Sequence, residues 1–313
     1  MVKTASAPRP ALRRRGENPI ASLTWPIFIE LLLQMLVGNA DQIMVGWYDP
    51  NSVGAIGNAN QITNLLLIVF SVVCTAATIL ISQYIGAEDT RRANETYAVS
   101  LLVNGLFGLG MGLLLMALCG PIFTLMQVPP EIFGETCLYI RIIGGGMVFQ
   151  SVFLTYTAFF RSSQLMKESM LISVAMNLLN IAGNAVFING AFGLPALGAA
   201  GAALSSDLSR MAGVVLILPP FVVLIALRFR RRFGPVLKLD LLRPFPRDQL
   251  RRLLRIGLPT GGESLSYDLS QICIQSICNG FTLAVINTRV YANLFAMLSY
   301  MFASAVSQAA QVV

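Results

Sequence analysis

The most constraining feature of this sequence is an internal repeat with an offset of 233 residues. When residues 26–80 are paired without a gap with residues 259–313, 12 of the 55 pairs are identical, where a composition this apolar gives about four by chance. Repeated hydrophobic segments interrupted by proline are typical of secondary transporters. The repeat therefore predicts a helical membrane protein built from two related halves. The identical pairs include Pro26 with Pro259, Glu30 with Glu263, and Gln42 with Gln275.

The composition also indicates a membrane protein. Hydrophobic residues make up 55% of the chain and charged residues 12%, whereas about a quarter of a soluble domain is charged. We therefore predict an all-α polytopic fold, with a six-helix N-lobe in residues 19–227 and the first two helices of a second lobe in residues 256–313. Because a membrane span needs about 20 apolar residues, we predict eight spans, at 20–47, 53–84, 97–119, 139–160, 169–188, 196–227, 256–279 and 289–313.

Basic residues give the expected orientation of the chain. Nineteen of the 22 Lys and Arg residues fall on one side of the predicted membrane, which the positive-inside rule makes cytoplasmic. We expect an inner-membrane protein of a bacterium with a cytoplasmic N-terminus, residues 1–18, and a cytoplasmic linker, residues 228–255. Six spans precede the second copy, so the repeats are predicted to be parallel. The net charge of +7 is then a topology signal that favours contact with lipid headgroups and not with nucleic acid.

The sequence lacks the motifs of the common enzyme classes. It has no His, no G-x-x-x-x-G-K-[ST] phosphate loop, and neither the G-x-S-x-G nor the H-E-x-x-H motif. We therefore expect neither enzymatic activity nor a cofactor. The five Cys residues lack metal-ligand spacing. Buried free thiols are expected, with a Cys119–Cys137 bridge as the alternative.

Glycines are frequent in the third, fourth and sixth predicted spans. Small residues allow helix backbones to approach closely inside a membrane, where no hydrophobic force drives helices together. We therefore expect helix contacts at these positions, namely Gly105, Gly108, Gly110, Gly112, Gly144 to Gly146, Gly198 and Gly201.

Polar residues inside the first and fifth spans are candidates for a cation site. Asp41 lies within a predicted span that has no Lys or Arg, and a carboxylate at this depth needs a partner, water or a proton. Asn180 and Asn184 fall on one stripe of a helix together with Asn177, and their amide oxygens suit a cation. We predict that Asp41, Asn180, Asn184 and Ser206 bind H⁺ or Na⁺. A structural hydrogen-bonded Asp and a polar helix–helix seam are the alternatives.

A second set of polar residues is predicted to line a cleft for substrate. Glu30 and Glu263 are equivalent under the repeat, and each follows a proline by four residues, where the missing hydrogen bond can bend the helix. Asp207 and Arg210 are three residues apart, so an intrahelical ion pair is expected there. The sequence assigns no role to Asp268. The predicted cleft residues are Glu30, Gln34, Asn60, Gln61 and Glu263.

Several short strings together resemble the MATE family, the multidrug and toxic compound extrusion transporters. They are Pro26-Ile-Phe-Ile-Glu30, Asp41-Gln-Ile-Met-Val-Gly46, Ala55-Ile-Gly57, Asn60-Gln-Ile62 and Gln83-Tyr-Ile-Gly86. The resemblance implies two six-helix lobes that alternate between inward-open and outward-open states. It also implies that Asp41 is the cation-site aspartate, Asn180 the fifth-span asparagine and Glu263 the seventh-span glutamate. Asn184 departs from the family, because some members have a second aspartate at that position.

The leading hypothesis is a monomeric exporter of cationic or amphipathic compounds, coupled to Na⁺ or H⁺. Twelve spans are implied and eight are predicted, so further spans are expected beyond Val313. A flippase for a lipid-linked saccharide is the first alternative, and it requires cationic residues in the cleft. A membrane receptor or scaffold without transport is the second.

Overall fold

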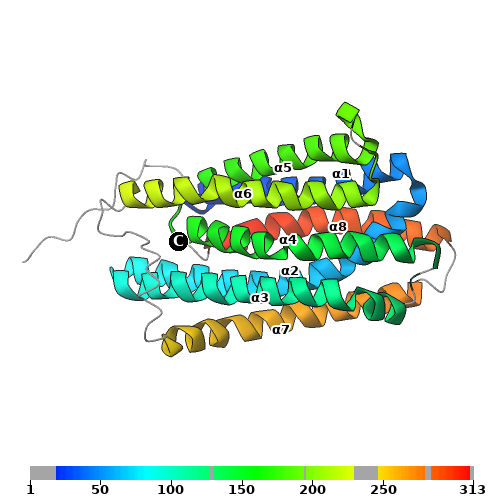
Figure 1. Ribbon diagram of the computed structural model, residues 1–313. Helices are drawn as coiled ribbons and strands as arrows, with labels where there is room; N and C mark the ends of the chain where they lie inside the picture. The colour runs from blue at the N-terminus through cyan, green and yellow to red at the C-terminus, as the bar shows by residue number, and fades with distance from the viewer. Residues whose placement is uncertain are drawn as a thin grey trace, which may run out of the picture.

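The structure is a computed structural model that describes residues 19–126, 128, 130–193, 195–228, 246–278 and 283–310. Within these ranges the chain is helical, and no strand occurs (Figure 1). The helices are α1 (Pro19–Tyr48), α2 (Pro50–Gly86), α3 (Thr90–Leu125), α4 (Pro130–Ser162), α5 (Met166–Asn189), the 3-10 helix η1 (Ala191–Gly193), α6 (Ala199–Arg228), α7 (Arg247–Cys278) and α8 (Leu283–Ala310). The all-α prediction is confirmed.

Within the described residues, each predicted span falls on one helix apart from residues 196–198, which precede α6, and most of the helices extend past the predicted ends. Residues 279 and 311–313 of the last two predicted spans lie outside the described residues. The two largest differences are equal: α4 begins at Pro130 and not at residue 139, and α7 begins at Arg247 and not at residue 256. Pro246 accepts hydrogen bonds from the backbone N–H groups of Gln249 and Leu250 through its carbonyl, and Asp248 lies in the first turn, where an acidic side chain favours a helix start. The C-terminal part of the predicted linker is therefore helical. Residues 1–18 and 229–245 lie outside the described residues.

Length and composition identify membrane-spanning helices independently of the fold. Among the described residues, five helices are long and apolar enough to cross a membrane, from α2 to α6, and α1 contributes the shorter apolar stretch Thr24–Leu33. Large apolar side chains such as Leu106, Leu113 and Leu178 are exposed on these helices, as expected where lipid is the solvent. The protein is a multi-pass membrane protein. The count of eight spans and the division into lobes stay predictions.

Helices α3 and α4 cross closely at glycines. A Cβ at Gly112 would collide with the backbone carbonyl of Gly144, and a Cβ at Gly108 would collide with the side chain of Ser151. Gly105, Gly110 and Gly145 instead have no atom within 4 Å of such a Cβ. The predicted role of glycine in helix packing therefore holds for some of these positions and not for others.

Gly112→Ala is expected to destabilise the protein. The added methyl group meets backbone, which cannot rotate away, and overpacking of this kind costs about 1–3 kcal/mol. The free energy of unfolding can be measured by denaturant titration in detergent micelles. Gly110→Ala is the matched control on the same helix, and it should be neutral or stabilising because Ala is the better helix former. Equal losses of stability in both variants would contradict the proposed crossing.

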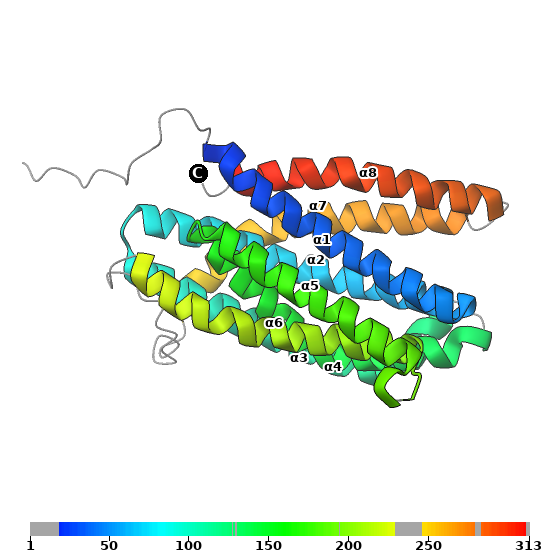
Figure 2. The ribbon, with the colours of Figure 1, turned by 90° about the horizontal axis from the view of Figure 1, so that it is seen from above.

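The two repeat copies contact each other in a symmetric way. Helix α1 packs on α8, and helix α2 packs on α7 (Figures 1 and 2). Val72 and Ala76 of α2 meet α7 at Gly257, and Val72 also meets Gly261. The offset of 233 relates these α2 residues to Ala305 and Ala309, which are buried in the cluster formed by α1 and α8. The two interfaces therefore use equivalent positions.

Positions that are equivalent under the repeat carry side chains of different size in the two interfaces. In the α2–α7 interface, the larger side chain is Val72 on α2 and the small residues are the α7 glycines. In the α1–α8 interface, Phe28, the repeat equivalent of Gly261, packs against the cluster that contains Ala305. Phe28 also makes an edge-to-face contact with Phe302, at 5.7 Å between ring centroids. Each interface therefore pairs a large side chain with a small one, and in both interfaces the large side chain belongs to the first copy of the repeat and the small one to the second.

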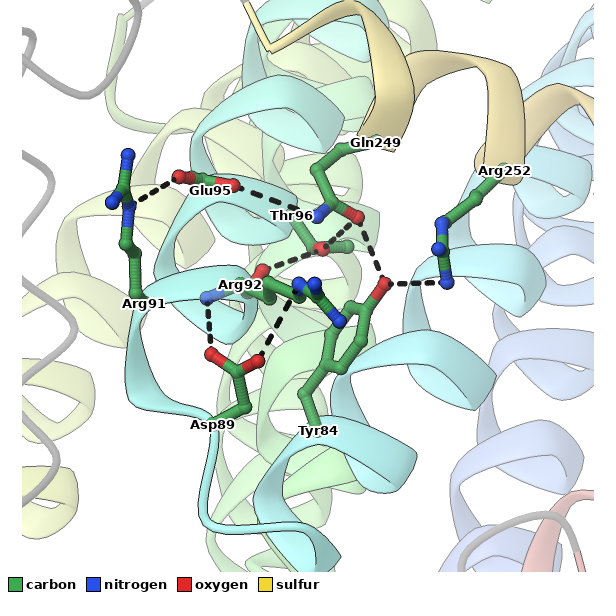
Figure 3. A network of polar contacts seen from close by, with 8 residues as sticks. All are labelled: Tyr84, Asp89, Arg91, Arg92, Glu95, Thr96, Gln249 and Arg252. Atoms are coloured by element: carbon green, nitrogen blue, oxygen red, sulfur yellow. Dashed lines mark hydrogen bonds and ion pairs between the residues drawn. The ribbon is translucent and has the colours of Figure 1, made fainter.

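The beginning of α7 is held against α2 and α3 by a polar network (Figure 3). The Tyr84 hydroxyl donates to Oε1 of Gln249 at 3.0 Å, and Thr96 lies 3.4 Å from the same oxygen. Nε2 of Gln249 donates to Glu95 at 3.5 Å. Because Gln249 is buried, these contacts satisfy an amide that would otherwise be costly to bury. They fix the position of α7 relative to the first helices of the chain.

Candidate cation site

Helices α1 and α5 lie side by side in register, and this register brings the candidate site together. Ser173 of α5 donates a hydrogen bond to Oε1 of Glu30 at 3.3 Å, and Asn184 of α5 donates to Asp41. Both contacts join residues that are 143 positions apart in the sequence. Glu30 and Asp41 are eleven residues apart on α1, and eleven residues make close to three helical turns. The two acidic residues of α1 therefore point to the same side, toward α5.

The predicted cation-site residues form one connected cluster. The side-chain nitrogen of Asn184 donates to Oδ1 of Asp41, and the Ser206 hydroxyl lies 3.4 Å from Oδ2 of the same carboxylate. The side-chain nitrogen of Asn180 donates to Ser206 at 3.1 Å. All four side chains are buried. Three different helices, α1, α5 and α6, thus contribute to the surroundings of Asp41.

Small residues allow α6 to come close enough to α5 for these contacts. A Cβ at Gly183 would collide with the Ser205 side chain, and a Cβ at Gly201 would collide with the backbone of Phe187. Ser205 uses this space to donate to the backbone carbonyl of Asn180 at 2.7 Å. The position of Ser206, the next residue on α6, is fixed by this approach. Sequence reasoning gave Gly201 a packing role but did not identify Gly183.

Two amide oxygen atoms of the cluster are poorly satisfied as hydrogen-bond acceptors among the described residues. Oδ1 of Asn184 is fully buried and, within the part of the chain that the structure describes, has no hydrogen-bond partner. Oδ1 of Asn180 lies 3.5 Å from the Asn184 nitrogen, a long contact. Carboxylate, amide and hydroxyl oxygens are the ligands that hard cations prefer. A proton or a small cation beside Asp41 would therefore compensate the buried charge.

Arg210 is the cationic side chain that acts on Asp41 electrostatically, but it is paired with another residue. Its NH1 atom lies 3.3 Å from Oδ1 of Asp207, as the spacing of these residues predicts. Among the described residues, no ion pair involves Asp41. The guanidinium group of Arg210 is therefore paired with Asp207 and not with Asp41. The hydrogen-bond partners of Asp41 are the neutral side chains of Asn184 and Ser206.

Glu30 has surroundings that the sequence did not predict. It is 1% exposed, and its Oε1 atom lies 3.3 Å from NH2 of Arg161 on α4. Arg161 lies in the last turn of α4, just past the predicted span, and its side chain is 18% exposed. The expectation of a cleft-lining carboxylate at Glu30 does not match this buried ion pair. Nothing in the sequence separates Arg161 from the other basic residues near helix ends.

Among the other predicted cleft residues whose side chains the structure describes, none forms a hydrogen bond or ion pair with Glu30. Asn60 is half-buried on α2, whereas Gln61 on α2 and Glu263 on α7 are exposed. The repeat-equivalent pair Glu30 and Glu263 therefore occupies two different environments. The side chains of Gln34 and Asp268 lie outside the described part of the structure.

The two cysteines for which a bridge was the alternative do not form one. Cys119 and Cys137 are free thiols, and both are buried.

Two comparisons of the sequence identify relatives. The sequence model of the MatE family matches residues 26–186. The uncharacterized transporter YisQ of Bacillus subtilis is 34% identical over 99% of this chain and 67% of that protein. The probable multidrug resistance protein NorM of Thermotoga maritima is 27% identical over 82% of this chain and 54% of the relative. PmpM, a multidrug resistance protein of Pseudomonas aeruginosa, is 29% identical over 61% of this chain and 40% of its own length.

Solved structures share the fold. A MOP superfamily transporter from Pyrococcus furiosus aligns with a TM-score of 0.81 at 22% identity, over 94% of this chain and 63% of that chain. A MATE structure in the bent conformation aligns with a TM-score of 0.81 at 21% identity, over 94% of this chain and 64% of that chain. The chain thus spans about two thirds or less of the length of these relatives. By its sequence match and its fold, the chain belongs to the MatE family.

Proposed function

We propose that this protein is a secondary active transporter that exports cationic or amphipathic compounds in exchange for Na⁺ or H⁺. The multidrug resistance proteins among its relatives support this class of substrate. The expected form is a monomer in the inner membrane of a bacterium, with its N-terminus in the cytoplasm. No cofactor other than the coupling ion is expected.

The observation that carries this proposal is the chemistry around Asp41. Its carboxylate is buried, it contacts the neutral side chains of Asn184 and Ser206, and an amide oxygen beside it has no partner among the described residues. Burying a carboxylate without a counter-charge costs at least about 2.5 kcal/mol inside a membrane. Binding of the coupling cation removes this cost.

Cation binding at Asp41 is proposed to drive the conformational change. The site joins α1 to α5 and α6, so a change in the relative position of these helices changes the set of oxygen atoms around the cation. A ligand shifts a conformational equilibrium only by the difference in its affinity for the two states. Because three helices share the site, its affinity for the cation can differ between the two conformational states. The exposed residues Gln61 and Glu263 are proposed to meet the substrate, with Asn60 beside them.

The flippase alternative receives no support from the cationic residues. A diphosphate group needs Arg or Lys side chains that are free to bind it. Two half-buried Arg residues, Arg161 and Arg210, each form an ion pair with a carboxylate. Both guanidinium groups are therefore occupied within the protein.

Transport can be tested with the protein expressed from its own gene and reconstituted into liposomes. Uptake or release of a fluorescent cationic dye should accelerate when a pH gradient or a Na⁺ gradient of the correct sign is imposed. An ionophore that collapses the gradient should return the rate to that of empty liposomes. Dye movement that is equally fast with and without both gradients would contradict coupling to a cation.

A further inference from the structure

A row of buried polar side chains on α5 continues from the Asp41 cluster to the Glu30–Arg161 pair. We call this row, together with the two α1 carboxylates that it faces, the α1–α5 seam. The spacings of three and four residues keep the row on one face of the helix. On α5, its members are all buried, and they are Ser169, Ser173, Asn177, Asn180 and Asn184.

Buried polar atoms without a partner are concentrated along this seam. Among the described residues, they include Oγ of Ser169, the side-chain nitrogen of Asn177 and Oδ1 of Asn184. Nε of Arg161, at the inner end, is a fourth. Buried polar groups in native proteins are almost always hydrogen-bonded, to protein or to ordered water. A row of unsatisfied atoms is therefore the signature of a site for water.

The spacing along the seam suits a short chain of water molecules. With a rise of 1.5 Å per residue, Ser173 and Asn184 lie about 16 Å apart along α5. Asn177 is one turn beyond Ser173, and Asn180 is about one turn further, so a polar group occurs at each turn.

We propose that the α1–α5 seam is a water-lined path through which protons move between Asp41 and the cytoplasmic side, with the Glu30–Arg161 pair at its inner end. This inference rests on the proposed function and names H⁺ as the coupling ion. The seam suits H⁺ because its unsatisfied polar atoms can hold water molecules, and hydrogen-bonded water conducts protons. A proton passes along hydrogen-bonded water without a metal cation resting beside the guanidinium.

The number of protons is conserved at every step of the proposed proton transfer. The Asp41 carboxyl group gives its proton to the adjacent water, and that water passes a different proton to the next one. Each water ends with two protons, and one proton leaves at the inner end. Charged and titratable groups close to this route include Arg210, Asp207 and Tyr139 around Asp41, Arg161 beside Glu30, and Cys74, on which Arg161 acts electrostatically. Glu30 can take the proton in transit, which would weaken its ion pair with Arg161.

Asn177→Leu is the sharpest test, because an apolar side chain midway along the seam should expel water. In liposomes, the maximal rate of export driven by a pH gradient is expected to fall at least about tenfold, which corresponds to 1.36 kcal/mol in the barrier. The substrate concentration for half-maximal rate should not change. Asn177→Gln, which keeps the polar group, should restore most of the rate. Leu178→Met, on the exposed face of the same helix, is the matched control and should transport normally.

The results of these variants distinguish a failure of the proposed proton path from a failure of the proposed transport function. Loss of coupled transport in Asp41→Asn together with an unaltered rate in Asn177→Leu would overturn the path and leave the proposed function intact. A protein driven by Na⁺ gradients alone would also overturn it. If Asn177→Leu is not recovered as a monodisperse protein, Ser173→Ala gives the same test at the inner end. Normal proton-driven rates in Ser173→Ala would then count against the path, and a slow rate rescued by Ser173→Thr would support it.

Discussion

The Asp41→Asn variant is expected to lose cation-driven transport almost completely. The substitution keeps the size of the side chain but removes the negative charge that binds the cation. A cation about 4 Å from a carboxylate is attracted by roughly 4 kcal/mol at an effective dielectric constant of about 20, and the neutral amide of Asn gives up this attraction. With tenfold in affinity for every 1.4 kcal/mol, cation affinity should fall by at least about 100-fold. Dye transport in liposomes under an imposed gradient measures the loss.

Two controls separate this effect from a folding defect. Asp49→Asn removes a carboxylate just beyond the end of the same helix, where the side chain is not part of the Asp41 cluster, and it should transport normally. The thermal stability of Asp41→Asn should be unchanged or higher, because the variant no longer buries a charge. Normal gradient-driven transport by Asp41→Asn would remove the cation site from the mechanism.

Arg161→Ala is expected to have the largest effect on stability. Glu30 is 1% exposed, so removing the guanidinium leaves a buried carboxylate that keeps, among the described residues, the hydrogen bond from the Ser173 hydroxyl. Breaking a buried ion pair from one side typically costs about 3–5 kcal/mol. Because Arg161 itself is partly exposed, the lower end, about 3 kcal/mol, is expected. Denaturant titration in micelles measures the free energy of unfolding.

A double variant tests whether the loss comes from the uncompensated charge. Glu30→Gln combined with Arg161→Ala removes both charges, and replacing a whole buried pair by neutral groups is often close to neutral. The double variant should therefore recover at least about half of the stability lost in Arg161→Ala. If the double variant is as unstable as the sum of the two single variants, the two side chains do not depend on each other.

The helices were predictable because the physical demands of the membrane are local. A span requires a continuous apolar segment, and the repeat related the first two helices to the last two. The stripe of Asn180 and Asn184 follows from helical periodicity alone. The extension of α7 to Arg247 was not predictable from hydropathy, because a helix that continues into water needs no apolar residues. Proline and acidic residues at its start were the available signal.

The contacts between helices were harder to predict, because they depend on how each helix is rotated against its neighbours. Periodicity placed Asn184 on a polar stripe of its helix, and Asp41 was singled out as a charge inside a span, but neither observation showed that the two side chains meet. Arg161 is similar in sequence context to Lys167, yet the structure pairs Arg161 with Glu30. The glycines show the same limit, since Gly110 and Gly112 are two residues apart and Gly112 alone is at the helix crossing.

The different sizes of equivalent side chains at the two repeat interfaces have a consequence for the ancestry of the protein. If two copies of the first helical hairpin met each other, the bulky Phe28 of one would face Val72 of the other, and there would be no room for both. Two copies of the last hairpin would place Gly261 opposite Ala305 and leave a void. Neither half can serve as its own partner any longer. The two duplicated hairpins have diverged into complementary surfaces. Neither hairpin, expressed alone, is therefore expected to form a symmetric homodimer.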